Sequence, residues 1–389
     1  MRTMHSVLKH GGLYWDRELL PQSLYEARVT ALQAAICESG DDAWLLFGDI
    51  ERHGNVVYAT NFMPRVRSAL AFVPKSGAPV LMANIGLRDV PAAKTITWIE
   101  DVRPFGRLPK DLAGLLEKQG LANGAIGVCG FEESLPVADW NAIQKNLPNV
   151  RWTDRGALLR AMRAIKQPAE IEAIRRAAVI ADNALALAPS LLHPGVTVRQ
   201  AIAAIDLQVR NAGAEDARYL VATGPQAGVS LRPVDDRVLV AGDTVVLTIA
   251  VQAQRYWAET ARTFMLGKAS PELRELHEVA ASALSEMIAV TKADFAARAV
   301  AAAGEAALDP KIAAGAGAYG FGHGIGLDAE EGPTLSAESA DIIARDATLV
   351  LRVIAHGNGQ GAATAATVVA GRSRCRPLGA MTSLIEIPA

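Results

Sequence analysis

The sequence predicts an α+β protein built from two domains, and three observations support that fold class. A chain of 389 residues exceeds what one hydrophobic core usually organises, so two domains are expected. Residues 1–157 alternate short apolar runs with helical stretches, which is the pattern of an α/β domain. Residues 158–389 alternate helices with antiparallel strand pairs, which is the pattern of an α+β domain.

The first domain is expected to begin with a helix and to continue as a sheet. Apolar residues recur at helical spacing from Pro21 to about Cys37, and this spacing predicts the helix. Five apolar runs then read as strands, namely AWLLFG, VVYAT, ALAFVP, PVLMAN and TITWIEDV. Helical stretches over 110–119 and 136–144 alternate with two further short strands, AIGVCG and VRW, which complete the domain.

The second domain is expected to open with helices and to contain a central hairpin. Pro168 stands at the first turn of a long helix, where its missing N–H removes no helical hydrogen bond. A helix over 198–212 and the strand ARYLVATG lead to the hairpin at 242–264. Helices over 270–291 and near 295–305 follow, and the segments DATLVLRVIAHGNGQ and ATAATVVAG read as the last two strands.

Two stretches of the second domain carry the most informative motifs. The hairpin, GDTVVLTIAVQAQRYWAETARTF, has β-branched residues on its first strand and Glu259 and Arg262 on its second. Later in the chain, YGFGHGIGLDAEEGP places His323 among glycines, with carboxylates close behind. Together they resemble the central hairpin and the Gly-His-Gly segment of the pita-bread family, which includes methionine aminopeptidase, aminopeptidase P, prolidase and creatinase. The resemblance implies a C-terminal pita-bread domain at 158–389, preceded by a creatinase-type N-terminal α/β domain at 1–157.

The resemblance also implies a metal site that this sequence does not supply. In the pita-bread metallopeptidases two Asp, one His and two Glu residues hold two divalent ions, because such ions need anionic oxygen to offset their dehydration. The matching positions are Thr248, Glu259 and His323, with the last two near Arg352 and Ala365. Residues 244–258 and 347–385 contain no Asp or Glu, so a shifted alignment restores no carboxylate. We therefore expect a protein that uses neither a metal nor another cofactor.

Three residues are candidates for catalysis. The imidazole of His323 is approachable between Gly322 and Gly324, and it suits general acid–base chemistry near neutral pH; the alternative is a structural histidine. Glu259 occupies a family ligand position and can bind substrate or orient water, or it can pair with Arg352 and fill the vacated metal cavity. Glu331 follows the glycine run, in Glu330-Glu331, where the family has a His-Glu pair.

Further residues are candidates for binding the substrate. Arginine pairs with a carboxylate through two hydrogen bonds, so the sequence offers several anchors, with surface arginine as the ordinary alternative. Arg262 lies three residues from Glu259, so the two side chains are expected on opposite faces of a regular strand, with Glu259 toward the site. The candidates for binding are Arg352, Arg262, Arg232, Arg67, Arg65, His356 and Trp257.

These residues lead first to a metal-independent hydrolase of a C–N bond (amide, amidine or guanidino) in a small polar substrate. Creatinase is the family precedent for hydrolysis without metal, but its catalytic histidine falls on Leu231 here, so its base does not carry over. The first alternative is a binding module of the same fold without catalysis. The second is a divergent metallopeptidase of the Xaa-Pro type that uses a ligand set such as Glu259, His323 and His356.

Composition limits the partners and the compartment. The net charge of −2 and the pI of about 6.4 indicate no basic face for nucleic acid. No run of about eighteen apolar residues predicts a membrane span, and residues 1–15 lack the apolar core of a signal peptide. Three cysteines without a CxxC motif suggest the reducing cytoplasm. The resemblance implies a homodimer in which the region of Arg65 and Arg67 covers the partner subunit's pocket.

Overall fold

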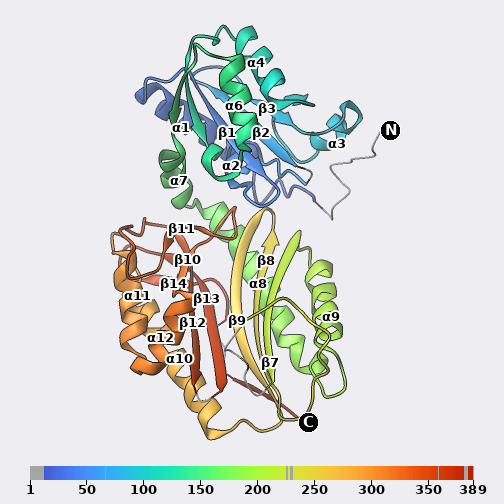
Figure 1. Cartoon of the computed structure of the whole chain (residues 1–389), viewed down its shortest axis with the longest axis vertical. Helices are drawn as coiled ribbons and strands as arrows, with labels where there is room; N and C mark the ends of the chain where they lie inside the picture. Colours follow the sequence, from blue (N-terminus) through green and yellow to red (C-terminus); the bar gives the residue numbers. More distant parts are fainter. Residues whose placement is uncertain are drawn as a thin grey trace. The chain divides into compact units, whose positions relative to one another are not determined.

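The structure is a computed structural model that describes residues 13–65, 67–224, 227, 231–357, 359–380 and 384–388. The chain divides into two compact units, Met1–Arg163 and Ala164–Ala389, each with its own sheet (Figure 1). The expected boundary between residues 157 and 158 falls on helix α7 (Gly156–Ala164). No helix among the described residues is long and apolar enough to cross a membrane.

The N-terminal unit is built on a six-stranded sheet with the order β4-β3-β2-β1-β5-β6. Adjacent strands of this sheet are parallel, except that β2 is antiparallel to both β1 and β3. The carboxyl ends of the other five strands therefore lie at one edge of the sheet. Helices α4 and α6 cover one face through a shared apolar cluster. The elements are α1 (Gln22–Glu38), β1 (Ala43–Asp49), α2 (Gly54–Thr60), β2 (Ser68–Pro74), β3 (Val80–Ala83), β4 (Asp101–Pro104), α4 (Leu108–Lys118), β5 (Ala125–Cys129), α6 (Val137–Asn146) and β6 (Arg151–Asp154).

Two of the expected strands in this unit differ from the structure. VVYAT is part of helix α2, and all seven residues of that helix are buried. A short helix that is buried on every side shows no polar face, so its sequence looks like a buried strand. Of TITWIEDV, only Asp101 and Val102 belong to a strand, β4. The first helix and the remaining strands are confirmed.

The C-terminal unit is built on a nine-stranded sheet with the order β11-β10-β12-β13-β9-β8-β7, while β14 pairs with β13 and β15 pairs with β9. Its strands are β7 (Asp216–Gly224), β8 (Thr244–Ala253), β9 (Tyr256–Leu266), β10 (Gly322–Gly324), β11 (Glu331–Thr334), β12 (Thr348–Gly357), β13 (Gln360–Ala370), β14 (Cys375–Pro377) and β15 (Ile385–Ile387). Its helices are α8 (Pro168–Leu191), α9 (Val198–Asn211), α10 (Pro271–Val290), α11 (Ala297–Ala306) and α12 (Pro310–Tyr319).

The two faces of this sheet differ in what covers them. Helices α8 and α9 pack on β7, β8 and β9 through one apolar cluster, and α10, α11 and α12 pack on β12 and β13 through another (Figure 1). Because strand side chains alternate, every second residue points to the opposite face, which we call the inner face. Its apolar cluster is dominated by small side chains: Ala222, Ala250, Ala261, Ala363 and Ala365, with Trp257, Val246, Val350 and Ile354 around them. The inner face therefore has little bulk at its centre.

Candidate functional site

Strand register brings the five family ligand positions together on the inner face. Thr248 lies opposite Ala261 and Ala261 opposite Ala365, which in turn lies opposite Arg352. The next row of the sheet contains the other two positions. Glu259 stands two residues before Ala261 on β9, and His323 lies opposite Val350, two residues before Arg352. Residues from five strands thus converge, as the resemblance implies.

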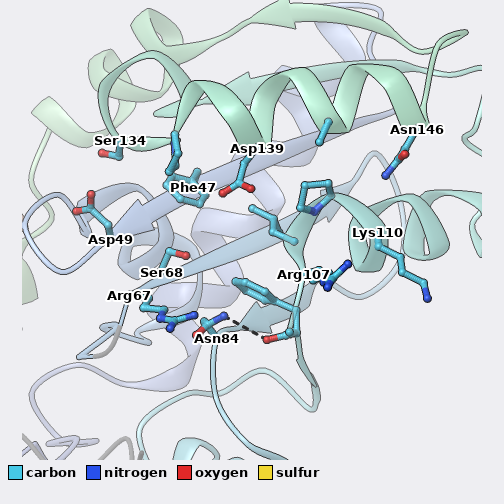
Figure 2. Close-up of a pocket in the computed structure, with 16 residues that line it drawn as sticks. Phe47, Asp49, Arg67, Ser68, Asn84, Arg107, Lys110, Ser134, Asp139 and Asn146 are labelled. Carbon is cyan, nitrogen blue, oxygen red and sulfur yellow. Dashed lines mark hydrogen bonds between the residues drawn. The ribbon is translucent and has the colours of Figure 1, made fainter.

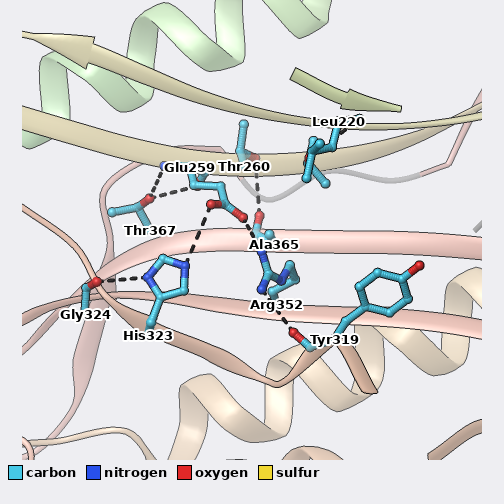
Figure 3. Close-up of polar contacts among 10 residues, drawn as sticks. Leu220, Glu259, Thr260, Tyr319, His323, Gly324, Arg352, Ala365 and Thr367 are labelled. Atoms are coloured by element: carbon cyan, nitrogen blue, oxygen red, sulfur yellow. Dashed lines mark hydrogen bonds and ion pairs between the residues drawn. The ribbon is translucent and has the colours of Figure 1, made fainter. Parts of the chain in front are cut away.

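An ion pair lies at the centre of this group (Figure 3). The Arg352 Nη1 atom donates to Glu259 Oε1 at 2.9 Å, and Nη2 donates to the carbonyl of Tyr319 at 3.2 Å. The Nε2 atom of His323 is 4.0 Å from the other Glu259 oxygen, Oε2. The side chains of His323, Glu259 and Arg352 keep 11, 12 and 18% exposure, so solvent reaches the group.

The tautomer of His323 follows from its neighbours. Its Nδ1 atom is 2.9 Å from the carbonyl oxygen of Gly324, which can only accept a hydrogen bond. Nδ1 therefore carries the proton, and in the neutral imidazole the lone pair of Nε2 faces Glu259. Glycine is required on both sides: a Cβ at Gly322, whose φ is +130°, would collide with the Val350 carbonyl, and one at Gly324 with the Gly332 carbonyl. The Gly-His-Gly motif thus allows neighbouring backbone to approach closely and fixes the ring.

Glu259 is also held through its backbone. Its N–H donates to Thr367 Oγ1 at 2.9 Å, and the Thr367 hydroxyl donates to the Glu259 carbonyl at 2.8 Å. These two bonds join β9 to β13 at the carboxylate. Thr367 was not among the predicted site residues, although its two-residue spacing from Ala365 places both side chains on one face.

The residues at the five positions do not fit a pair of divalent ions. They supply one carboxylate, one imidazole, one guanidinium, the hydroxyl of Thr248 and the methyl of Ala365. The charges of Glu259 and Arg352 cancel, and no group of three or more His, Cys, Asp or Glu among the described residues is arranged to hold a metal ion. Chemistry at these positions must therefore come from the side chains themselves.

Glu331 lies in a second buried ion pair. It accepts from Lys166 Nζ at 2.9 Å and from the Asp328 N–H at 3.2 Å, and the side chains of Lys166 and Glu331 are 3 and 9% exposed. Lys166 belongs to the segment before helix α8. The contacts of Glu331 join two segments that are distant in the sequence, and its catalytic role stays a prediction.

Arg262 lies on the face opposite to Glu259, as their spacing predicts. It pairs with Asp182 of helix α8 at 3.3 Å, and burial raises the pKa of that carboxyl despite the guanidinium. Burial also lowers the pKa of Arg262. Because this pair lies at α8, the structure does not bring Arg262 together with Glu259, and substrate binding by Arg262 stays a prediction.

The other predicted binding residues of this unit are dispersed. Arg232 bridges Val221 of β7 through its backbone, and its exposed side chain lies 3.9 Å from Asp235. His356 is on the same strand as Arg352, and both side chains point to the same face of the sheet. It lies four residues, or roughly 13 Å, further along the strand. Trp257 is buried at 1% exposure in the inner-face cluster, with the guanidinium carbon of Arg218 4.9 Å from its ring centroid.

The other two predicted arginines belong to the N-terminal unit, which has a hollow of about 660 Å³ of its own (Figure 2). This hollow lies where β1, β3 and β4 end. Arg67, whose φ of +56° is unusual for a residue other than glycine, lines it together with Arg107, Lys110 and Asp139. Arg65 is half-buried and does not line this hollow.

Comparison with known families decides the assignment. Residues 172–370 match metallopeptidase family M24, and residues 28–165 match the creatinase/prolidase N-terminal domain. The chain belongs to metallopeptidase family M24. This membership confirms the pita-bread fold, the preceding creatinase-type domain and the family predicted from the hairpin and the Gly-His-Gly segment.

Individual relatives of this M24 chain are similar at low identity. An uncharacterized peptidase, YqhT of Bacillus subtilis, is 24% identical over 77% of this chain and 85% of its own length. An Xaa-Pro dipeptidase of Pyrococcus horikoshii is 26% identical over 53% of this chain and 60% of its own length. The X-Pro aminopeptidase structure from Thermotoga maritima superposes with a TM-score of 0.83 at 22% identity, over 92% of this chain and 99% of that one.

Two of these three names describe peptidases of the Xaa-Pro type, the third describes a peptidase without a stated specificity, and none describes a creatinase. Of the family hydrolases, the Xaa-Pro type is therefore the nearer comparison, and this M24 member departs from it at four of the five positions implied for metal ligands.

Proposed function

We propose that this M24 domain hydrolyses a C–N bond in a small polar substrate with Glu259, His323 and Arg352, and without a pair of divalent ions. The single observation that carries the proposal is the 4.0 Å separation of His323 Nε2 and Glu259 Oε2. Both atoms accept hydrogen bonds when His323 is neutral and Glu259 is ionised. The separation is too long for a direct hydrogen bond, but one water molecule can donate to both.

Such a water is positioned as a nucleophile. His323 Nε2 takes one proton while the water oxygen attacks the carbon of the C–N bond, and Glu259 balances the resulting imidazolium charge. The oxyanion that forms on an amide is stabilised by the Arg352 guanidinium, a charged donor next to Glu259. His323 then returns its proton to the leaving nitrogen as the C–N bond breaks. One water is consumed, and an acid and an amine are released.

The family supports a choice of the bond to test first. M24 relatives named as Xaa-Pro peptidases act on an amide, so an amide is the first bond to test, with amidine and guanidino bonds next. We also propose a homodimer in the cytoplasm. Light scattering on the purified chain tests the dimer, and fractionation of the source cells tests the compartment.

A non-catalytic binding module is the second candidate function. The Glu259–Arg352 ion pair supports it, because each side chain already has a partner where the family implies metal ions. A module of this kind binds a ligand but releases no product. The two candidates therefore differ in a directly measurable outcome.

The test is a turnover screen combined with metal analysis of the same sample. The full chain is dialysed against a chelator and assayed for amine or ammonia release from small amides, Xaa-Pro dipeptides, ureido acids and guanidino acids. We expect turnover with a substoichiometric divalent metal content by plasma emission. His323→Ala and Glu259→Gln should each lower kcat by about 10²- to 10⁴-fold, whereas the exposed-site control Glu272→Gln should not.

Two results would contradict the proposal in different ways. If no substrate is turned over, the catalytic assignment fails and the binding module stands. If turnover follows a retained stoichiometric metal and is lost with it, the Xaa-Pro metallopeptidase alternative replaces the metal-free mechanism.

A further inference from the structure

The hollow of the N-terminal unit has the size and the place of a small-molecule site. Its volume of about 660 Å³ lies within the roughly 300–1,000 Å³ of cavities that hold small ligands. Strands β1, β3 and β4 run in the same direction and end at this hollow. Ligands of α/β sheets usually bind outside the carboxyl ends of such strands. The hydrolysis proposed above uses no residue of this unit, so a ligand here is a second one.

The charged side chains of the hollow are divided between two sides. Figure 2 shows the carboxylates in the upper half of the view, Asp49 and Asp139, and the cations in the lower half, Arg67, Arg107 and Lys110. Asp139 belongs to helix α6, whereas Lys110 belongs to the first turn of α4 and Arg107 directly precedes that helix. A ligand in the hollow therefore meets negative charge on one side and positive charge on the other.

Four of these five charged side chains are available to a ligand. Within the described part of the chain, no ion pair or hydrogen bond is formed by the side chains of Arg67, Arg107, Lys110 and Asp139. Asp49 differs, because its Oδ1 atom accepts two backbone N–H groups of the turn that follows β1, at 2.9 and 2.7 Å. Asp49 thus stabilises a turn, and Asp139 is the carboxylate that a ligand can bind.

The N-terminus of helix α4 is not itself the place for an anion. Asp111 Oδ2 accepts the N–H of Gly106 at 3.0 Å and the N–H of Arg107 at 3.1 Å, so a carboxylate of the chain already caps this helix end. An anionic group of the ligand is therefore bound by the side chains of Arg107 and Lys110. Arg67 adds a third cation at the same edge of the sheet, just before β2 begins.

Much of the remaining lining is apolar. Phe47 and Phe105 line the hollow and are buried in the sheet, and Leu108 and Pro136 line it as well. Rings held in this way favour another ring or a large aliphatic group, which gains both burial and favourable packing. The lining as a whole therefore fits a molecule with an apolar body that carries one cationic and one anionic group.

We propose that the hollow binds a zwitterion with an aromatic body, an amino acid of the phenylalanine class. Its carboxylate pairs with Arg107 and Lys110, and its ammonium group pairs with Asp139. A ligand that lacks either charge makes only half of these contacts and leaves a charge on the opposite side without a partner. The site is separate from the residues proposed for hydrolysis and does not depend on them.

The test compares three probes with the same phenylethyl body by isothermal titration calorimetry on the full chain. Phenylalanine carries both charges, 3-phenylpropionate only the carboxylate, and phenethylamine only the ammonium group. We expect phenylalanine to bind at least about tenfold more tightly than either analogue. None of the three probes contains an amide, amidine or guanidino bond, so the outcome does not depend on whether the protein is a hydrolase.

Two variants separate the two sides of the hollow. Arg107→Gln should weaken phenylalanine and 3-phenylpropionate by about tenfold and leave phenethylamine unchanged, because only the first two present a carboxylate. Asp139→Asn should weaken phenylalanine and phenethylamine and leave 3-phenylpropionate unchanged. This crossed pattern is specific to the proposed contacts, since a general loss of structure weakens all three probes. Thermal melts should show that each variant is folded.

Two control variants locate the ligand. Arg151→Gln removes an exposed arginine of β6 that does not line the hollow, and Glu259→Gln changes the candidate catalytic site. Both should leave the affinity for phenylalanine unchanged. The inference is overturned if the wild type binds phenylalanine no more tightly than its analogues. It is also overturned if Glu259→Gln weakens phenylalanine while Asp139→Asn does not, since the ligand then lies on the inner face.

Discussion

Two carboxylate–guanidinium pairs on the β8–β9 hairpin differ in burial and in what surrounds them. At the turn, the Glu215–Arg255 pair has no exposed side-chain surface, and Glu215 also accepts the Arg255 N–H at 2.7 Å. Mid-sheet, the Glu259–Arg352 pair keeps 12 and 18% exposure and has an imidazole 4.0 Å away. A carboxylate and a guanidinium thus stabilise the hairpin turn in the Glu215–Arg255 pair, whereas in the Glu259–Arg352 pair they are partly exposed beside an imidazole. Burial and neighbours, rather than residue type, separate the structural pair from the candidate site.

Breaking the turn pair should have the largest effect on stability. Arg255→Met leaves the Glu215 charge buried without its guanidinium, so the free energy of unfolding should fall by about 3–5 kcal/mol. Urea denaturation measures the change. A loss below about 1 kcal/mol would show that the two pairs are energetically alike and remove the contrast drawn between them.

Introducing carboxylates at the ligand positions that the family implies should create metal binding at the Glu259–Arg352 pair and not at the Glu215–Arg255 pair. The triple variant Thr248→Asp, Arg352→Glu and Ala365→Glu, with Glu259 and His323 retained, supplies four carboxylates and one imidazole in the register described. Manganese at a hundred times its dissociation constant should then stabilise the variant by about 2.7 kcal/mol. Thermal melts with and without the ion measure this, with the wild type as the unshifted control. Equal shifts in both proteins would mean that a metal site exists already.

Removing the mid-sheet carboxylate should cost less stability than breaking the turn pair. Glu259→Gln should lower the free energy of unfolding by about 1–2 kcal/mol, because the amide keeps a hydrogen-bonding group toward Arg352 and solvent reaches both. The same urea experiment tests it. A cost equal to that of Arg255→Met would make this pair primarily structural and favour the binding module.

The smallest expected effect concerns a histidine outside both ion pairs. His277 of helix α10 is buried, and burial lowers its pKa below the usual 6.5. As pH falls below about 6.5, the unfolded chain binds a proton that the folded chain resists, so stability decreases. Urea midpoints between pH 8 and pH 5 should fall more steeply for the wild type than for His277→Gln. Parallel curves would show that His277 does not contribute.

The sequence correctly predicted the family and the face of strand β9 on which Glu259 lies, because both depend on local patterns. The Gly-His-Gly segment and the hairpin are contiguous motifs, and the three-residue offset correctly separated Glu259 from Arg262. Helix α2 was missed because complete burial hides helical periodicity.

Long-range partners could not be read from the sequence. Lys166 lies 165 positions from Glu331, and Thr367 lies 108 positions from Glu259. Each pairing depends on tertiary packing or on the order of strands in the sheet, which no local pattern encodes. The ion pair between Glu331 and a lysine from before helix α8 was not predicted for this reason.

The alanines at the centre of the inner face have a consequence for laboratory evolution. Ala250, Ala261, Ala363 and Ala365 belong to strands whose other face is packed by helices in separate apolar clusters. The four alanines are nevertheless buried beside Trp257, Val350 and Ile354, so a larger side chain there must displace its neighbours. A combinatorial library at these positions would therefore exchange stability for new binding chemistry, and it should be screened for folding as well as for binding.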